Sequence, residues 1–351
     1  MPAPPSGPIT GRIEVIVDDS PRAFRIDRRG HFFGEPDHAI RQSLATQAIA
    51  RVERGRGGRT LAFKVTLEDG TVGYYKPEQT FSGSHWYAEI ASYYLDRELG
   101  LGRVAPVVGR RLPWTRLRPE AGSDPRVPEV LVSEDGTVRG AFIMWVPGGL
   151  EPLELGRDWE RWLRFEPLGL TPYQRPSVYA SLASNGGAET NYFDGLEENP
   201  YEDEDLSETT PARRRLATDP DTPERPAELS DLILFDYLTH NVDRWGGNFT
   251  NVRTRGERGP LMFFDNGAAF TPGRARIPLM DSRLFSCQRF RRSTIDAVTA
   301  LDLARLRRRM SADPLAPILT DSQLDALEAR RQTLIEHVET MRSRFGDPIW
   351  F

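Results

Sequence analysis

The sequence predicts an α+β fold with two lobes, a β-rich first lobe and a mainly helical second lobe. The chain has 351 residues, roughly twice the size of a common single domain, which favours one large bilobal domain or two small ones. Strand-like runs dominate the first half, around an Asp-Gly hairpin signal at Asp69 and Gly70, whereas the C-terminal end has a helical apolar stripe. Hydrophobic residues make up 38% of the chain, enough for a sizeable core, so wholesale disorder is excluded.

The first lobe is predicted at residues 51–148. Residues 1–50 are expected to form an N-terminal extension that packs on the core, with a loose beginning rich in Pro and Gly and a modest helix at Ser43–Val52. A Pro-Gly-Gly run at 147–149 then breaks the chain and marks the lobe boundary. The expected elements of the first lobe are strands at Thr60–Leu67, Thr71–Lys76, Arg103–Arg111 and Gly140–Val146, and a helix at residues 84–99 that Gly100 ends.

The second lobe is predicted at residues 149–351, with a flexible acidic insertion at about residues 185–227. Within it, residues 188–212 hold nine acidic and no basic side chains, a charge run typical of a solvated loop rather than a metal site. Order is expected to return at Ser230, which can cap a helix through Leu238. The other expected elements are a short helix at Trp159–Phe165, strands at Phe249–Arg253 and Leu261–Phe264, and a C-terminal helix with a capping box at Thr320 and Gln323 and a core stripe of Leu324, Leu327, Leu334, Val338 and Met341.

Acidic and basic side chains are nearly balanced, with 46 Lys and Arg against 51 Asp and Glu and a formal net charge of −5. This balance argues against a nucleic-acid partner. No run approaches the ~18 apolar residues of a membrane span, and the N-terminal residues lack an apolar signal core, so we expect no membrane partner and a cytoplasmic location. The single cysteine, Cys287, excludes an intrachain disulfide and a cysteine-based zinc cluster and is expected to be a small buried hydrophobe.

Lysine is rare in this chain: of the 46 basic residues only Lys64 and Lys76 are lysines. Lysine presents a compact point charge that fits beside a phosphate oxygen, whereas arginine presents a broad planar fork. A lysine kept in so arginine-rich a chain is therefore a candidate site residue. The alternative is chance retention on a solvated strand.

The stretch from Asn241 to Gly267 carries the most chemical information. Asp243 follows a predicted helix, Asn248 stands five residues later, and Asp265 ends the second strand of a predicted hairpin. Phosphoryl transfer needs one carboxylate to orient the attacking hydroxyl and accept its proton. It also needs an amide oxygen and a second carboxylate to hold divalent metal on the phosphates. The order of these residues matches that layout.

Both aspartates also have a structural alternative. Asp265, with Asn266 and Gly267, has the composition of a simple turn. Asp243 could pair with the neighbouring Arg244. However, an unpaired carboxylate at the end of the apolar run LMFF would cost several kcal/mol, which favours a cation or hydrogen-bond donors at Asp265.

The first lobe offers the remaining parts of a nucleotide site. Lys76 ends a predicted strand and Glu89 lies on the next helix, the order of a phosphate-binding lysine and its acidic partner or metal ligand. A Gly-rich run before the first strand could cover phosphates, although it fits a flexible turn equally well. The strand end before the Pro-Gly break could supply hinge hydrogen bonds to adenine. The cofactor-binding candidates besides Lys76 are thus Lys64, Gly57, Gly58, Trp145 and Val146.

Other common motifs are absent. There is no GxxxxGK[ST], which excludes a P-loop NTPase, and no HExxH or GxSxG, which removes a common metalloprotease class and the hydrolase elbow. The five histidines are too scattered to suggest a metal cluster.

Residues 55–345 resemble the atypical kinases of the animal secretory pathway, the group of the Golgi casein kinase, the glycosaminoglycan xylosylkinase and the four-jointed kinase. The segments that carry the resemblance are YYKPEQ at 74–79, HWYAEIASYYLDRELGLGRVAPVVGR at 85–110, DLILFDYLTHNVDRWGGN at 231–248, FFDNGAAF at 263–270 and CQRFRRSTI at 287–295. The third segment is most similar to the four-jointed branch, and the chain is identified as a bacterial-type homologue of it. The resemblance implies an atypical protein-kinase-like bilobal fold.

The resemblance also implies roles for individual residues. Lys76 would contact ATP phosphate, Glu89 would help hold the metal or pair with Lys76, Asp243 would be the catalytic base, and Asp265 would be the principal metal ligand. Asn248 matches the four-jointed branch but not the casein-kinase branch. The relatives are secreted and disulfide-bonded, whereas this chain has one cysteine.

The resulting hypothesis is a phosphotransferase that uses ATP with Mg²⁺ or Mn²⁺. Its acceptor would be a hydroxyl group of a protein Ser/Thr, a sugar or another small molecule. The alternatives are a nucleotide-binding pseudokinase that acts as a regulatory module and an AMP transferase on the same fold. Arg289, Arg291 and Arg292 would suit an acidic substrate or simply cover a solvated helix.

Overall fold

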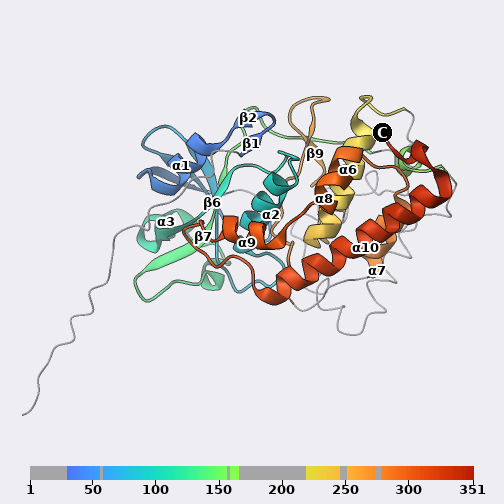
Figure 1. The fold of residues 1–351 in the computed structure, drawn as a ribbon. Helices are drawn as coiled ribbons and strands as arrows, with labels where there is room; N and C mark the ends of the chain where they lie inside the picture. Colours follow the sequence, from blue (N-terminus) through green and yellow to red (C-terminus); the bar gives the residue numbers. More distant parts are fainter. Residues whose placement is uncertain (1–29, 56–57, 156–158, 166–218, 246–250, 273–277) are drawn as a thin grey trace, which may run out of the picture.

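The computed structural model describes residues 30–55, 58–155, 159–165, 219–245, 251–272 and 278–351. Strands dominate its N-terminal region and helices its C-terminal region (Figure 1), which confirms the predicted α+β fold class. The predictions for Gly57, Asn248 and most of the acidic insertion lie outside the described residues. The division into an N-terminal extension and two lobes stays a prediction.

The main sheet has five antiparallel strands in the order β3-β4-β5-β7-β6. Burial alternates along its strands because successive side chains point to opposite faces. On one face, Phe63, Val65, Tyr75 and Phe142 are fully buried and form a core. On the other, Lys76 pairs in register with Ala141 and stays partly open. The strands are β3 (Ile49–Arg54), β4 (Phe63–Leu67), β5 (Val72–Pro77), β6 (Val107–Pro113) and β7 (Thr137–Met144).

The predicted helix at Ser43–Val52 is wrong in part. The structure has helix α1 at His38–Thr46 and then the edge strand β3 from Ile49. The strand pairs with β4 through contacts such as Val52 to Val65, and this tertiary pairing overrides a weak local helix preference. The helix α2 at Trp86–Glu98 agrees with the prediction, and Gly100 follows it with a φ of +69°, a backbone conformation that glycine adopts readily.

The C-terminal region is built mainly on two long helices. The helix α6 (Arg225–Thr239) is buried along its whole length, and α10 (Asp321–Phe345) packs against it. The predicted capping box of Thr320 and Gln323 is confirmed, and so is the buried stripe of α10. The other elements in the described residues are β1 (His31–Phe32), β2 (Glu35–Pro36), α3 (Trp114–Ala121), α7 (Pro278–Ser286), α8 (Arg292–Thr299), α9 (Leu303–Met310), short 3₁₀ helices at Val127–Glu129, Trp159–Leu163 and Asp347–Ile349, and a small sheet of β8 (Glu151–Pro152), β9 (Arg253–Thr254) and β10 (Leu261–Met262).

The predicted start of α6 at Ser230 is wrong, because the helix begins at Arg225 with Pro226 in its first turn, a position that proline favours. Ser230 is instead a buried helical residue whose hydroxyl donates to the carbonyl of Arg289 at 2.8 Å. Cys287 is fully buried as expected, and burial raises the pKa of its thiol to about 11. None of the helices in the described ranges has the length and apolar character that crossing a membrane requires.

His337 on α10 makes stability depend on pH. It is 7% exposed, and one ring nitrogen lies 2.7 Å from the carbonyl oxygen of Cys287. Desolvation lowers the pKa of His337 below its ordinary 6.5. His337 therefore binds a proton more readily in the unfolded chain than in the folded one. Stability is lost as the pH falls through about 6.5, the pKa of the histidine in the unfolded chain. We expect the Tm of the wild type to fall between about pH 7.5 and about pH 5 by more than that of H337Q. Equal losses in calorimetry would contradict this.

Candidate active site

Lys76 joins the two regions of the fold. From β5, its Nζ donates to Oε1 of Glu89 on α2 at 2.6 Å and to Oδ1 of Asp265 after β10 at 2.6 Å. The side chains of Lys76 and Glu89 are only 15% and 5% exposed. Desolvation favours the neutral amine, but the charges of Asp265 and Glu89 outweigh it and raise the pKa of Lys76. Three of the predicted site residues therefore form one charged cluster, with the lysine ionised at its centre.

Asp265 is held in an uncommon backbone conformation, with a φ of +54°. Its backbone oxygen accepts from Nδ2 of Asn241 at 3.3 Å, and the next amide, of Asn266, donates to Oε2 of Glu89 at 3.2 Å. Burial opposes ionisation of Asp265, but the charge and hydrogen bond of Lys76 prevail and lower its pKa. A hydrogen bond from the amide of Gly267 lowers the pKa of Asp265 further. Asp265 therefore forms an ion pair and also the kind of local turn contact that a purely structural role would require.

Gly267 allows the turn after Asp265 to approach the loop before α2. A Cβ atom at this position would lie 2.4 Å from Oγ of Ser84, a distance that real side chains do not tolerate. The carbonyl of Gly267 accepts from the amide of His85 at 2.7 Å. The close contact therefore fixes Asp265 relative to Glu89.

Asp243 lies just beyond α6 with its side chain exposed. Its Oδ2 accepts a long bond of 3.4 Å from Nδ2 of Asn251. The pKa of Asp243 is raised, first by desolvation among its neighbours and second by the like charge of Asp265. The alternative pairing with Arg244 is wrong, because Nε of Arg244 donates to both carboxylate oxygens of Asp236 at 2.9 Å. Asp243 is thus near enough to Asp265 and Lys76 to interact electrostatically with both.

The carboxylates of this cluster fit a divalent cation that arrives with phosphates. Among the residues the structure describes, no group of three or more His, Cys, Asp or Glu side chains could form a metal cage. Glu89 and Asp265 offer hard oxygen ligands on either side of Lys76. Mg²⁺ is commonly bound by one or two carboxylates and completed by substrate phosphates and water. The donor set therefore fits a metal–nucleotide complex better than a metal held by protein alone.

Lys64 does not join the Lys76 cluster. Its Nζ lies 4.5 Å from the ring centroid of Trp145, whose other neighbour is the ring of Tyr74 at 6.1 Å. Trp145 is 44% exposed although it is a large hydrophobic residue, whereas Val146 is buried. The amide of Trp145 already donates to the carbonyl of Val72, so Trp145 can offer a base its ring rather than this N–H.

The structure adds four residues to the site that were not predicted from the sequence as site residues. These are Tyr74, Asn241, Asn251 and Arg244. Tyr74 could have been found, since it stands two residues before Lys76 on a strand and therefore shares its face. The other three depend on long-range loop contacts. Of the glycine candidates, Gly58 is exposed with a φ of +79°.

The arginines near the end of the chain have structural partners. Arg291 donates to Asp231 at 2.8 Å, Arg289 stacks on the ring of Phe351 at 4.3 Å, and Arg292 stacks on Trp350 at 4.5 Å. These contacts favour a packing role over recognition of an acidic substrate.

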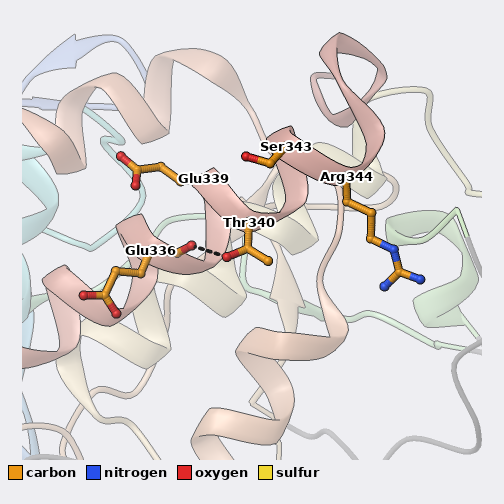
Figure 2. Close-up of a pocket in the computed structure, with 5 residues that line it drawn as sticks. All are labelled: Glu336, Glu339, Thr340, Ser343 and Arg344. Atoms are coloured by element: carbon orange, nitrogen blue, oxygen red, sulfur yellow. Dashed lines mark hydrogen bonds between the residues drawn. The ribbon is translucent and has the colours of Figure 1, made fainter.

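A pocket of about 580 Å³ lies along the C-terminal half of α10 (Figure 2), and neither Lys76, Glu89 nor Asp265 lines it. Thr340 donates to the carbonyl of Glu336 there at 2.8 Å, which is an ordinary helix contact. None of its described lining residues is a predicted site residue. These are Glu336, Glu339, Thr340, Ser343 and Arg344.

Comparison with known proteins finds similarity to one group of kinases. Residues 213–347 match the family model described as Golgi casein kinase, C-terminal, Fam20. The resemblance to the atypical secretory-pathway kinases is confirmed. The human glycosaminoglycan xylosylkinase is 24% identical over 352 residues, which covers 88% of this chain and 76% of that protein. The human extracellular serine/threonine protein kinase FAM20C is 22% identical and covers 88% of this chain and 54% of that protein.

A solved structure of the Golgi casein kinase with Mn and ADP bound has a TM-score of 0.59. The two sequences are 18% identical, and the match covers 88% of this chain and 77% of the solved one. At this identity the similarity establishes the fold. The prediction of a cytoplasmic location is wrong, because the matching family and the human relative are named for the Golgi and the extracellular space. The single cysteine and the absence of a recognisable signal were insufficient grounds for it.

Proposed function

We propose that the protein is a phosphotransferase that depends on ATP and a divalent metal and transfers the γ-phosphate to a hydroxyl group. One observation carries the proposal: Lys76 is bonded at 2.6 Å to both Glu89 and Asp265, with the exposed Asp243 close enough to feel the charge of Asp265. This brings a phosphate-binding cation, two metal-ligand carboxylates and a proton acceptor to one place.

Each residue has a distinct task in this mechanism. Lys76 binds the phosphates as a point charge. Asp243 orients the acceptor hydroxyl and takes its proton, which its raised pKa favours. Glu89 and Asp265 would hold the metal, which neutralises the charge that develops on the phosphates. Trp145, Tyr74 and Lys64 would border the base, and Asn248 would add an amide oxygen to the metal.

Lys76 must change partners when the nucleotide binds. In the described structure it compensates both carboxylates. If Glu89 and Asp265 held the metal, they would depend less on Lys76 for charge compensation, and its Nζ would be available to the phosphate oxygens. Nucleotide and metal are therefore expected to bind cooperatively.

The acceptor is a hydroxyl group of a protein or a sugar, in line with the serine/threonine kinase and xylosylkinase names of the relatives. We further propose that the chain is most similar to the four-jointed branch, because Asn248 stands five residues after Asp243. We also propose lobes at residues 51–148 and 149–351, with an N-terminal extension at residues 1–50. The net charge of −5 supports a partner other than nucleic acid.

Thermal unfolding tests the nucleotide site without the acceptor. We expect ATP with Mn²⁺ to raise the Tm relative to ATP with EDTA, by the equivalent of about 2.7 kcal/mol at 100 times the dissociation constant. K76M should remove most of this rise, because it removes the cation that binds the phosphates of ATP. The exposed R51M provides a control and should keep the rise.

No rise at millimolar ATP would overturn the proposal. A rise without turnover on any protein or sugar acceptor would indicate the pseudokinase alternative. If a labelled product forms, its mass distinguishes the added phosphate from the AMP of a transferase.

A further inference from the structure

We propose that Arg244, anchored by Asp236, is a positioning residue that sets the placement of Asp265 relative to Asp243. The catalytic consequence rests on the proposed function, whereas the geometry does not depend on it. Arg244 directly follows Asp243 in the chain. Its guanidinium reaches the two residues on either side of Asp265.

The anchor is a fully buried ion pair. Arg244 and Asp236 are both 0% exposed, and Nε of Arg244 lies 2.9 Å from each carboxylate oxygen of Asp236. The indole nitrogen of Trp245 donates to the same carboxylate at 2.8 Å, and its ring stacks on Trp159 at 5.5 Å. Because Asp236 lies on α6, which is buried along its whole length, the guanidinium is anchored to a helix of the core.

The remaining nitrogens of Arg244 hold the turn that carries Asp265. One Nη donates to Oδ1 of Asn266 at 2.6 Å, and the other donates to the carbonyl of Phe264 and, at 3.4 Å, to that of Asn251. Asn251 in turn bonds Asp243. A single planar group thus connects the segments that carry both aspartates. Lysine could not do this, because it lacks the rigid fork of donors.

The turn that carries Asp265 requires stabilising hydrogen bonds of this kind. Asp265 adopts a φ of +54°, a left-handed conformation that residues other than glycine adopt only occasionally. Strained residues persist only where their surroundings determine them. Here the bonds from Arg244 lie on both sides of the strained residue. Without them, we expect the turn to relax and the Asp265 carboxylate to leave its place beside Lys76.

The test compares R244K and N266A with R225K as a matched control. N266A removes the bond from Arg244 to the Asn266 side chain, together with the bond from that side chain to the carbonyl of Phe263 at 3.0 Å, but leaves the buried pair with Asp236 intact. Arg225 is also 0% exposed on α6, where it bonds Glu228 at 2.6 Å and the carbonyl of Gly259 at 2.8 Å. Hydrogen–deuterium exchange of residues 263–267 is measured in the ligand-free protein, and kcat, KM and Mn²⁺·ATP affinity are measured separately.

We expect exchange at 263–267 to be about tenfold faster in R244K and N266A than in R225K. In the same variants, kcat should fall by about 10²-fold, as for other misplaced reacting groups, while KM for the acceptor changes little. Slow exchange in both variants would overturn the proposal whether or not the protein binds nucleotide. Fast exchange in a protein whose wild type binds no Mn²⁺·ATP would support the positioning role and reject the proposed function.

Discussion

Replacing Asp265 with asparagine is expected to abolish metal-dependent nucleotide binding and, with it, phosphotransfer. Asparagine keeps the size of the side chain and tolerates the left-handed φ of +54°, so the turn should keep its shape. The change removes one of the two carboxylates that face Lys76 and would hold the metal. The Tm rise with ATP and Mn²⁺, equivalent to about 2.7 kcal/mol at 100 times the dissociation constant, should disappear.

The control for this variant is D69N, in an exposed hairpin turn where Asp69 accepts from the amide of Thr71 at 2.9 Å. It should keep both the Tm rise and the turnover. D265A is a poorer variant, because alanine at a left-handed φ adds strain and would lower stability without ligand. Retention of the metal-dependent Tm rise in D265N would show that the metal lies elsewhere.

The order of the elements could be predicted because alternation and turn chemistry are local signals. The Asp-Gly turn placed the hairpin of β4 and β5, although β4 begins at Phe63 rather than at Thr60. In the structure, alternation puts Tyr75 on the buried face and Lys76 on the partly open one. The start of β3 could not be predicted in this way. It follows α1 closely and is held by pairing with β4, a tertiary contact that local preference does not encode.

The site could be predicted only in part, for a similar reason. Lys76 lies near the end of β5, Glu89 in the first turn of α2 and Asp265 shortly after β10, so each of them was linked to a predicted element. The structural alternative paired Arg244 with its chain neighbour Asp243, whereas in the structure Arg244 bonds Asp236, eight positions earlier on α6. A buried guanidinium pairs with the carboxylate that shares its burial. Sequence proximity gives no guide to this choice.

Replacing Asp243 with asparagine should separate catalysis from binding. The amide cannot accept the proton of the acceptor hydroxyl, and a general base contributes about 10²–10⁴-fold to such reactions. We therefore expect kcat of D243N to be about 10²–10⁴-fold lower than that of the wild type. The Tm rise with ATP and Mn²⁺ should persist or increase, because Asp243 and Asp265 repel each other in the wild type. D265N should lose the Tm rise as well as turnover, so the Tm rise distinguishes the two variants.

The pH dependence of kcat gives a second measure of the same role. Desolvation first, and the charge of Asp265 second, raise the pKa of Asp243 above its ordinary 3.8. As the pH falls, Asp243 is therefore protonated earlier than a solvated aspartate, and a protonated carboxyl cannot take the hydroxyl proton. We expect the wild-type kcat to decline on the acidic side from a pH above the ordinary value, and the residual activity of D243N to lack this limb. An unchanged acidic limb in D243N, or a kcat equal to that of the wild type, would assign proton transfer to another group.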